Sequence, residues 1–272
     1  GIIEVDGELA VGIYAANVNQ SGAVTKTDEY AQKANVTISY DNQNATSADA
    51  IKVNYGAGVA GGTTTTKENK NLHGVGIALV EKNKDTIAAN RGGIITLNTK
   101  NNGIGQTADI LTFENGIGIY GESSDIKFKT DSTGLTVDTG SEGAGIWVTD
   151  DSNISSESDR LATPKTLNYN YKGYNDKKGF GMIFGSTMSG VSTDAKNYLD
   201  IKFNNNNDTS LTLTTEKTQT SPGTINSNKG TTRGIAGMLV NTDANDSVYN
   251  YGDIKEDTSK TNVRAYGAVV NK

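Results

Sequence analysis

The sequence has 272 residues, no cysteine, one histidine and a formal net charge of −6 at pH 7. The lack of thiols excludes disulfide scaffolds, thiolate zinc sites and cysteine nucleophiles, and the acidic balance disfavours nucleic acid as a partner. Hydrophobic residues make up only 34% of the chain, but they gather into short runs, so we expect a folded protein rather than a disordered one.

Most of these runs alternate apolar and polar residues, which is the period of a half-buried β-strand. Gly, Asn, Asp and Ser bound nearly every run, and these residues favour turns. Helical periodicity is nearly absent. In chain order the pattern predicts strands at residues 35–40, 50–55, 94–99, 109–115, 125–129, 134–139, 153–155, 166–171, 198–203, 210–215 and 247–254, with a further one near Asn262.

A second kind of segment recurs among these runs and consists of a small or apolar residue, a glycine and an apolar pair. It appears at residues 10–17, 75–83, 116–123, 143–150, 179–186, 236–242 and 265–272. We call its glycines the anchor glycines: Gly12, Gly76, Gly118, Gly145, Gly181, Gly237 and Gly267. The intervals between them are unequal, which excludes propellers and helical repeats, whose units have nearly fixed lengths.

Each interval between anchor glycines holds about two further strand-like runs, so one turn of the chain contains three strands. We therefore predict an all-β protein, a right-handed parallel β-helix of three-strand coils with about seven coils; the hand follows the general preference for right-handed crossovers. Stacked coils place inward side chains on their equivalents and build one narrow, continuous core. Glycine at the anchor suits a sharp bend or a crowded inward corner, and asparagines at corners are suited to amide ladders.

Residues 1–272 are predicted to be a single segment of a longer rod, because both ends of the chain fall within the strand pattern. Long surface insertions are expected near residues 56–73 and 216–233, where polar sequence interrupts the repeat. No stretch approaches the roughly 20 apolar residues of a membrane-spanning helix, so we expect no membrane insertion by this segment.

The repeats resemble those of a known family. Residues 116–123 (GIGIYGES), 10–17 (AVGIYAAN) and 236–242 (AGMLVNT), alternating with strands such as 248–254 (VYNYGDI), resemble the passenger repeats of type V autotransporters. They are most similar to those of the very large fusobacterial autotransporter adhesins. The lack of cysteine agrees with export through the oxidising periplasm.

The resemblance implies a surface-exposed passenger, held at the outer membrane by a C-terminal β-barrel outside these residues, or secreted. Members of the family act in coaggregation and in attachment to host cells. The expected function is therefore non-catalytic adhesion, and the expected partners are host cell-surface glycans, protein receptors and partner bacteria. A structural spacer within a longer adhesin is a second possibility that has the same sequence features.

A polysaccharide-degrading enzyme or a tail-spike-like protein is the alternative on this fold, and it needs two or three clustered carboxylates. Asp150 and Asp151 are adjacent, so a strand would point them to opposite faces, and we predict a polar turn there. Other aspartates lie on separate predicted coils: Asp125, Asp138, Asp200 and Asp253. We expect no catalytic residue, no cofactor and no metal site, because the glycine-rich segments lack the aspartates of calcium-binding repeats.

Three tyrosines within residues 168–175 (NYNYKGYN) are the candidate binding residues: Tyr169, Tyr171 and Tyr174. Tyrosine beside asparagine and lysine can pack against a sugar face and hydrogen-bond its hydroxyls. The competing interpretation is a strand whose alternate tyrosines pack an insertion against the rod. The sequence leaves both interpretations open.

Overall fold

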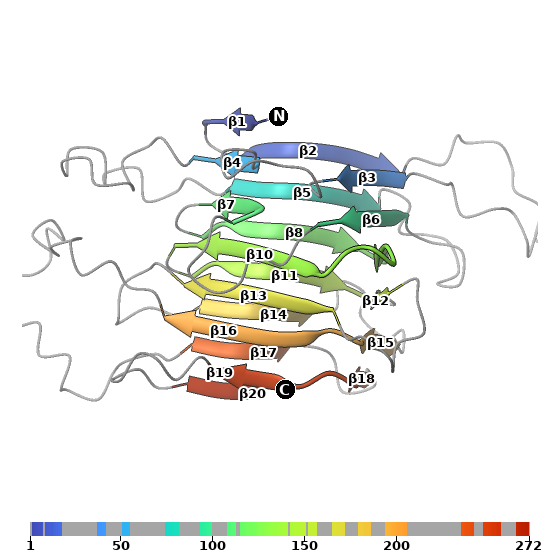
Figure 1. Ribbon diagram of the computed structural model, residues 1–272, viewed down its shortest axis with the longest axis vertical. Coiled ribbons are helices and arrows are strands. Elements are labelled where there is room, and N and C mark those ends of the chain that lie inside the picture. The colour runs from blue at the N-terminus through green and yellow to red at the C-terminus, as the bar shows by residue number, and fades with distance from the viewer. Residues whose placement is uncertain are drawn as a thin grey trace, which may run out of the picture.

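The computed structural model describes the part of the chain that forms a stack of short strands (Figure 1). All elements assigned among these residues are strands. The described residues are 2–7, 9–17, 37–41, 51–54, 74–81, 93–99, 108–112, 115–140, 142–150, 152–156, 165–171, 179–185, 194–205, 235–241, 247–256 and 265–271.

The strands form three parallel sheets, which we call A, B and C. Sheet A contains β1 (Ile3–Val5), β4 (Ile51–Val53), β7 (Ile110–Thr112), β10 (Gly134–Thr139), β13 (Thr166–Tyr171), β16 (Asp200–Asn205) and β19 (Ile254–Glu256). Sheet B contains β2 (Ala10–Asn17), β5 (Gly74–Glu81), β8 (Ile117–Glu122), β11 (Ala144–Thr149), β14 (Gly179–Gly185), β17 (Ile235–Asn241) and β20 (Ala265–Asn271). Sheet C contains β3 (Thr37–Asp41), β6 (Ile94–Asn98), β9 (Asp125–Phe128), β12 (Asn153–Ser156), β15 (Asp194–Asn197) and β18 (Ser247–Asn250).

The chain visits sheets B, C and A in turn and then returns to sheet B one layer further along. Thus β8 leads to β9 and β10, and β11 then pairs in parallel with β8. This path is that of a parallel β-helix with three strands per coil, as the sequence predicts. All seven anchor segments lie in sheet B, so the repeat seen in the sequence corresponds to one face of the coil.

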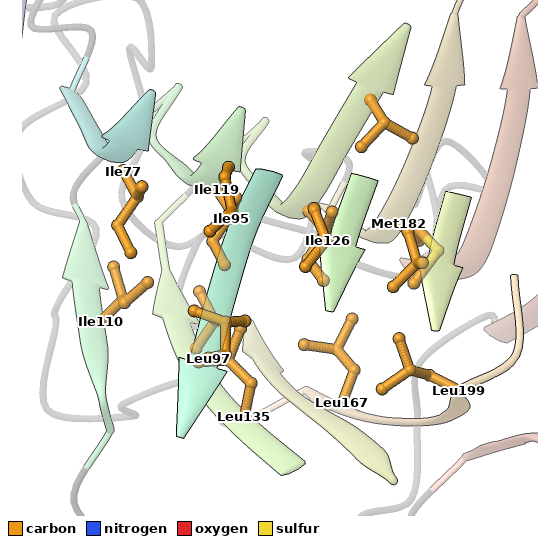
Figure 2. Packing of buried hydrophobic residues seen from close by; sticks show 14 of the residues in the cluster. Ile77, Ile95, Leu97, Ile110, Ile119, Ile126, Leu135, Leu167, Met182 and Leu199 are labelled. Carbon is orange, nitrogen blue, oxygen red and sulfur yellow. The ribbon is translucent and has the colours of Figure 1, made fainter. Parts of the chain in front are cut away.

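Inward side chains of the three sheets meet in one core. In sheet B the register stacks Ile77 on Ile119, then Ile146 and Met182, and all four side chains are fully buried. Figure 2 shows members of this row beside residues of the other sheets, namely Ile95, Leu97, Ile110, Ile126, Leu135 and Leu167. Each fully buried Leu or Ile contributes about 1.5–3 kcal/mol. Stacking therefore allows a chain of low overall hydrophobicity to maintain a continuous core.

The anchor glycines stack on one another from coil to coil within sheet B. A Cβ atom built on Gly145 would lie 2.6 Å from the carbonyl oxygen of Gly181 in the next coil, and one on Gly76 would lie 2.6 Å from that of Gly118. The ladder pairs Ala144 with Phe180 and Ile146 with Met182, passing over the glycine. The described glycines with positive φ are Gly7 and Gly134, which are not anchors. Space rather than a bend therefore requires glycine here. The expected crowding is present, but it occurs within the strands of sheet B and not at a corner.

Two corners between sheets C and A divide runs that the sequence presents as continuous strands. Residues 198–203 were expected to form one strand, but they contain the corner 198–199 followed by the start of β16. The strand before this corner, β15, is not among the strands that the sequence predicts. Residues 247–254 likewise divide into β18 and β19. At the first corner the buried Ala195, Leu199 and Ile201 keep a spacing of even numbers of residues, so periodicity alone does not reveal the corner. The predicted strands at 210–215 and near Asn262 lie outside the described residues.

The predicted insertions fall between sheets A and B. The connection from β4 to β5 includes residues 56–73, and the connection from β16 to β17 includes residues 216–233. Both segments lie outside the described residues. The equivalent connection from β10 to β11 covers only residues 140–143, so the same corner has very different lengths in different coils.

Candidate functional site

Tyr169 and Tyr171 lie on β13 and point into the core. Tyr169 is fully buried and Tyr171 is 1% exposed. The Tyr169 phenol donates to the carbonyl oxygen of Gly143 (3.0 Å), accepts from the backbone amide of Phe180 (3.2 Å) and lies 2.7 Å from the Thr139 hydroxyl. Burial raises the pKa of the Tyr169 phenol. This phenol therefore links sheet A to the start of the anchor strands.

Their burial is a correction to the proposed binding role of these two residues. Strand alternation directs both rings inward with Leu167, so neither ring presents a face to a ligand. The ring of Tyr171 also occupies the space that a side chain at residue 179 would need, and this position is a glycine. Both rings pack in the core of the coil and not between an insertion and the rod. Tyr174 lies outside the described residues.

Asp150 and Asp125 have structural contacts at or near corners. Asp150 is 4% exposed, has positive φ and accepts from the Thr149 hydroxyl at 3.1 Å, which agrees with the predicted polar turn. Asp125 accepts from the side-chain amide of Asn153 in the next coil at 3.2 Å. Asp151 lies outside the described residues.

A polar cluster lies on the outer side of sheet A, opposite the core-facing Leu135 and Val137 of β10. Asp109 accepts from the backbone amide of Thr136 at 2.9 Å, and Asn170 donates to Asp138 at 2.7 Å. All four of these residues are at most 4% exposed. Their hydrogen bonds join neighbouring strands, so we assign this cluster to the stability of the sheet.

Three tyrosines that the sequence did not point to meet at the surface of the protein. The tyrosine cluster consists of Tyr198, at the corner after β15, Tyr249 of β18 and Tyr251, at the corner after β18. The Tyr198 and Tyr251 rings stack with centroids 4.8 Å apart and planes inclined by 19°. The Tyr249 and Tyr251 centroids are 6.5 Å apart, with planes inclined by 17°. Tyr249 is 42% exposed and Tyr251 is 56% exposed.

Asparagines beneath the rings hold the two corners in the same geometry. The side-chain amide of Asn197 donates to the carbonyl oxygen of Leu199 (2.9 Å) and to the Asn250 side chain (2.8 Å). Asn250 repeats the turn bond by donating to the carbonyl oxygen of Gly252 (2.7 Å). This is the amide ladder that the sequence predicts for corner asparagines. Because it repeats from coil to coil, it places the Tyr198 and Tyr251 rings in register.

Charged side chains lie close to the cluster in sequence. Asp200 accepts from the backbone amide of Asp253 at 2.9 Å, so these two aspartates occupy stacked corners although they belong to separate coils. The Asp253 carboxylate forms an ion pair of 2.7 Å with Lys255, and both side chains are more than 60% exposed. The hydrogen bond from Lys255 to the Asp253 carboxylate raises the pKa of Lys255.

A sequence signal for the tyrosine cluster exists. Residues 197–202 read NYLDIK and residues 250–255 read NYGDIK. Aligning these two segments places the asparagines, the tyrosines and the aspartates on one another, as the structure does. The anchor motif drew attention to sheet B, whereas this second repeat marks the corner between sheets C and A.

The outer side of sheet B carries a pair of half-buried aromatic residues. The rings of Tyr120 and Trp147, on neighbouring strands β8 and β11, meet edge to face with centroids 5.8 Å apart. The Tyr120 phenol donates to Glu122 at 2.7 Å, and burial and this carboxylate raise its pKa. Its hydroxyl is thus engaged within the protein, and the indole Nε1 of Trp147 is enclosed without a hydrogen-bond acceptor. These features are typical of packing rather than of an open site.

The described residues define a protein of the parallel β-helix class. They contain no group of three or more His, Asp or Glu side chains that could hold a metal ion, and no helix suited to crossing a membrane. Comparison with protein-family models, with curated proteins and with solved structures finds no match to this chain.

Proposed function

We propose that this chain is part of the passenger of a bacterial autotransporter, located at the cell surface, and that it acts as a non-catalytic adhesin. The observation that carries the proposal is the same three-strand coil repeated along the chain, with connections of variable length between its strands. The interior rows of sheet B repeat from coil to coil, while the connections from sheet B to sheet C range from residues 123–124 to residues 18–36. A repeating scaffold whose connections vary in length suits recognition, because binding residues tend to lie in the segments that join regular elements.

The repeats support the same proposal. Three of the segments that resemble autotransporter passengers are anchor strands of sheet B, and residues 248–254 belong to sheets C and A of the same coils. The partners of such a chain are host cell-surface glycans or protein receptors and partner bacteria. Attachment at cell surfaces gains strength from many weak contacts acting together, so each chain needs only modest affinity.

The test is attachment of the purified, fluorescently labelled 272-residue chain to host cells and to partner bacteria. Saturable attachment that free galactosides or free arginine compete away is the expected result. The same chain unfolded in guanidinium and diluted at the moment of addition is the control for nonspecific adsorption. A chain that circular dichroism shows to be folded β-structure, and that attaches to none of these cells, would be a spacer and not an adhesin.

A further inference from the structure

The outer side of sheet B is apolar, whereas the outer sides of the other two sheets are polar. Asp138, Asn168 and Asn170 lie on the outer side of sheet A. Asp125 and Lys127 lie on the outer side of sheet C, because they alternate in β9 with core residues. Monomeric soluble proteins rarely expose contiguous apolar patches larger than a few hundred Å², so the outer side of sheet B calls for an explanation.

Two apolar rows run along the outer side of sheet B from β5 to β17. In β8 a Cβ atom on Gly118 would meet Val137 in the interior, and Ile119 belongs to the core. Alternation therefore directs Ile117, before the glycine, and Tyr120, after Ile119, to the outside. The register places one row at Val75, Ile117, Ala144, Phe180 and Ala236. It places the other row at Ala78, Tyr120, Trp147, Ile183 and Leu239.

The apolar rows are a property of complete coils. Each of the strands β5, β8, β11, β14 and β17 pairs with a strand of sheet B on both sides (Figure 1). Ala144, which is 1% exposed, lies between the larger Ile117 and Phe180. Part of each larger side chain remains accessible to solvent, since the half-buried members of the rows are Val75, Ile117, Tyr120, Trp147, Phe180 and Leu239.

The charge of the chain favours a contact between copies through sheet B. The strands β8, β11, β14 and β17 together contain one charged residue, Glu122, and its carboxylate accepts a hydrogen bond from the Tyr120 phenol. A second copy carries the same net charge of −6, so the two chains repel each other at long range. Placing like charges opposite one another is costly, so copies meet most favourably through a face that carries little charge.

The regular spacing of the rows also favours a second copy. Strands in a sheet lie about 4.8 Å apart, so the rows of two copies advance by the same step and can pack together along their whole length. The seven strands of sheet B, with about seven residues each, cover about 29 Å by 23 Å, or roughly 650 Å². This is close to the roughly 800 Å² that each partner buries in a stable interface.

We propose that sheet B is an interface between two copies of this chain, which pack their apolar rows face to face about a two-fold axis. A two-fold axis buries the same rows on both copies, and packed sheets lie about 10 Å apart. The half-buried rings of Tyr120 and Trp147 then lie in the middle of the contact. The inference goes beyond the proposed adhesive function and does not depend on it.

The experiment is sedimentation velocity of the 272-residue chain at rising protein concentration. The wild type is expected to convert from monomer to dimer, and the dimer should persist at high ionic strength, because salt screens charges and does not weaken apolar contacts. The double variant Phe180→Lys with Leu239→Lys places ammonium groups on the contact face of both copies. It should raise the Kd of dimerisation at least about tenfold.

Opposite charges provide a rescue. The variant Phe180→Glu with Leu239→Glu should also dimerise weakly, and an equimolar mixture of the lysine and glutamate variants should associate more tightly than either variant alone. A milder variant, Val75→Thr with Ile117→Thr, keeps β-branched side chains and so protects the strands. It should raise the Kd at least about fivefold, because the hydroxyls become buried without partners in the contact.

The matched control is Ser39→Lys with Thr130→Lys, which adds the same charge at exposed positions outside sheet B. It should dimerise as the wild type does, and circular dichroism should show that every variant compared is folded. A wild-type chain that stays monomeric up to its limit of solubility would overturn the proposal and leave the apolar rows to a different partner. Folded sheet B variants that dimerise as tightly as the control would also overturn it, because the copies would then meet through another face.

Discussion

Replacing the anchor glycine Gly118 by alanine tests the interior geometry most directly. The added Cβ atom would meet the carbonyl oxygen of Gly145 in the next coil and would lie 2.6 Å from Cγ1 of Val137 in sheet A. Neither neighbour can move without displacing a strand, because one is backbone and the other is a fully buried, β-branched side chain.

The expected cost follows from two opposing terms. Overpacking of a core by one methyl group costs about 1–3 kcal/mol, and the rigid neighbours here place the cost at the upper end of that range. Replacing a strand glycine by alanine gives back about 0.4–1 kcal/mol by reducing the freedom of the unfolded chain. The net loss of about 2 kcal/mol corresponds to a fall in Tm of roughly 4–8 °C for a chain of this size.

Gly121→Ala is the control within the same strand, β8. Its Cβ atom would lie 3.3 Å from Cβ of Ser124 and 3.7 Å from Cγ1 of Val148, which requires only a small adjustment. Thermal unfolding followed by circular dichroism should show Gly121→Ala within about 0.5 kcal/mol of the wild type. If Gly118→Ala were no less stable than Gly121→Ala, crowding between stacked coils would not explain the anchor motif.

Three further predictions concern stability. Tyr169→Phe should cost about 1–3 kcal/mol in denaturant unfolding, because the buried partners of its hydroxyl lose a hydrogen bond. Because burial raises the pKa of Tyr169, its contribution to stability is complete below the ordinary tyrosine pKa of about 10 and is lost as pH rises above it. The alkaline fall in Tm should therefore be smaller in Tyr169→Phe, and an equal fall would contradict this reasoning. Asn197→Ala should cost about 1–3 kcal/mol, because Asn197 is fully buried and its hydrogen-bond partners would be left unsatisfied. Asn250→Ala should cost clearly less, because water can replace the exposed Asn250 side chain. Equal shifts of the guanidinium midpoint in the two variants would argue against the buried ladder.

The candidate site shows where prediction from sequence reaches its limit. Tyr169 and Tyr171 were selected because they are close in sequence and flanked by asparagine. Alternation in β13 places both rings on the same face as Leu167, which is the core face, and places Asn168 and Asn170 on the other face. Leu167 is the sequence signal for this direction. Tyr198 and Tyr251 are separated by a whole coil, so their contact exists only because successive coils stack.

Local sequence by itself determined the all-β class, the three-strand coil and the set of equivalent anchor strands that form sheet B. Alternation, turn residues and the anchor motif act over a few residues, and the same pattern recurs in every coil. Tertiary structure decided the corners between sheets C and A and the alignment of the tyrosine cluster. These features depend on side chains meeting across coils, where the register of parallel strands joins residues far apart in the chain.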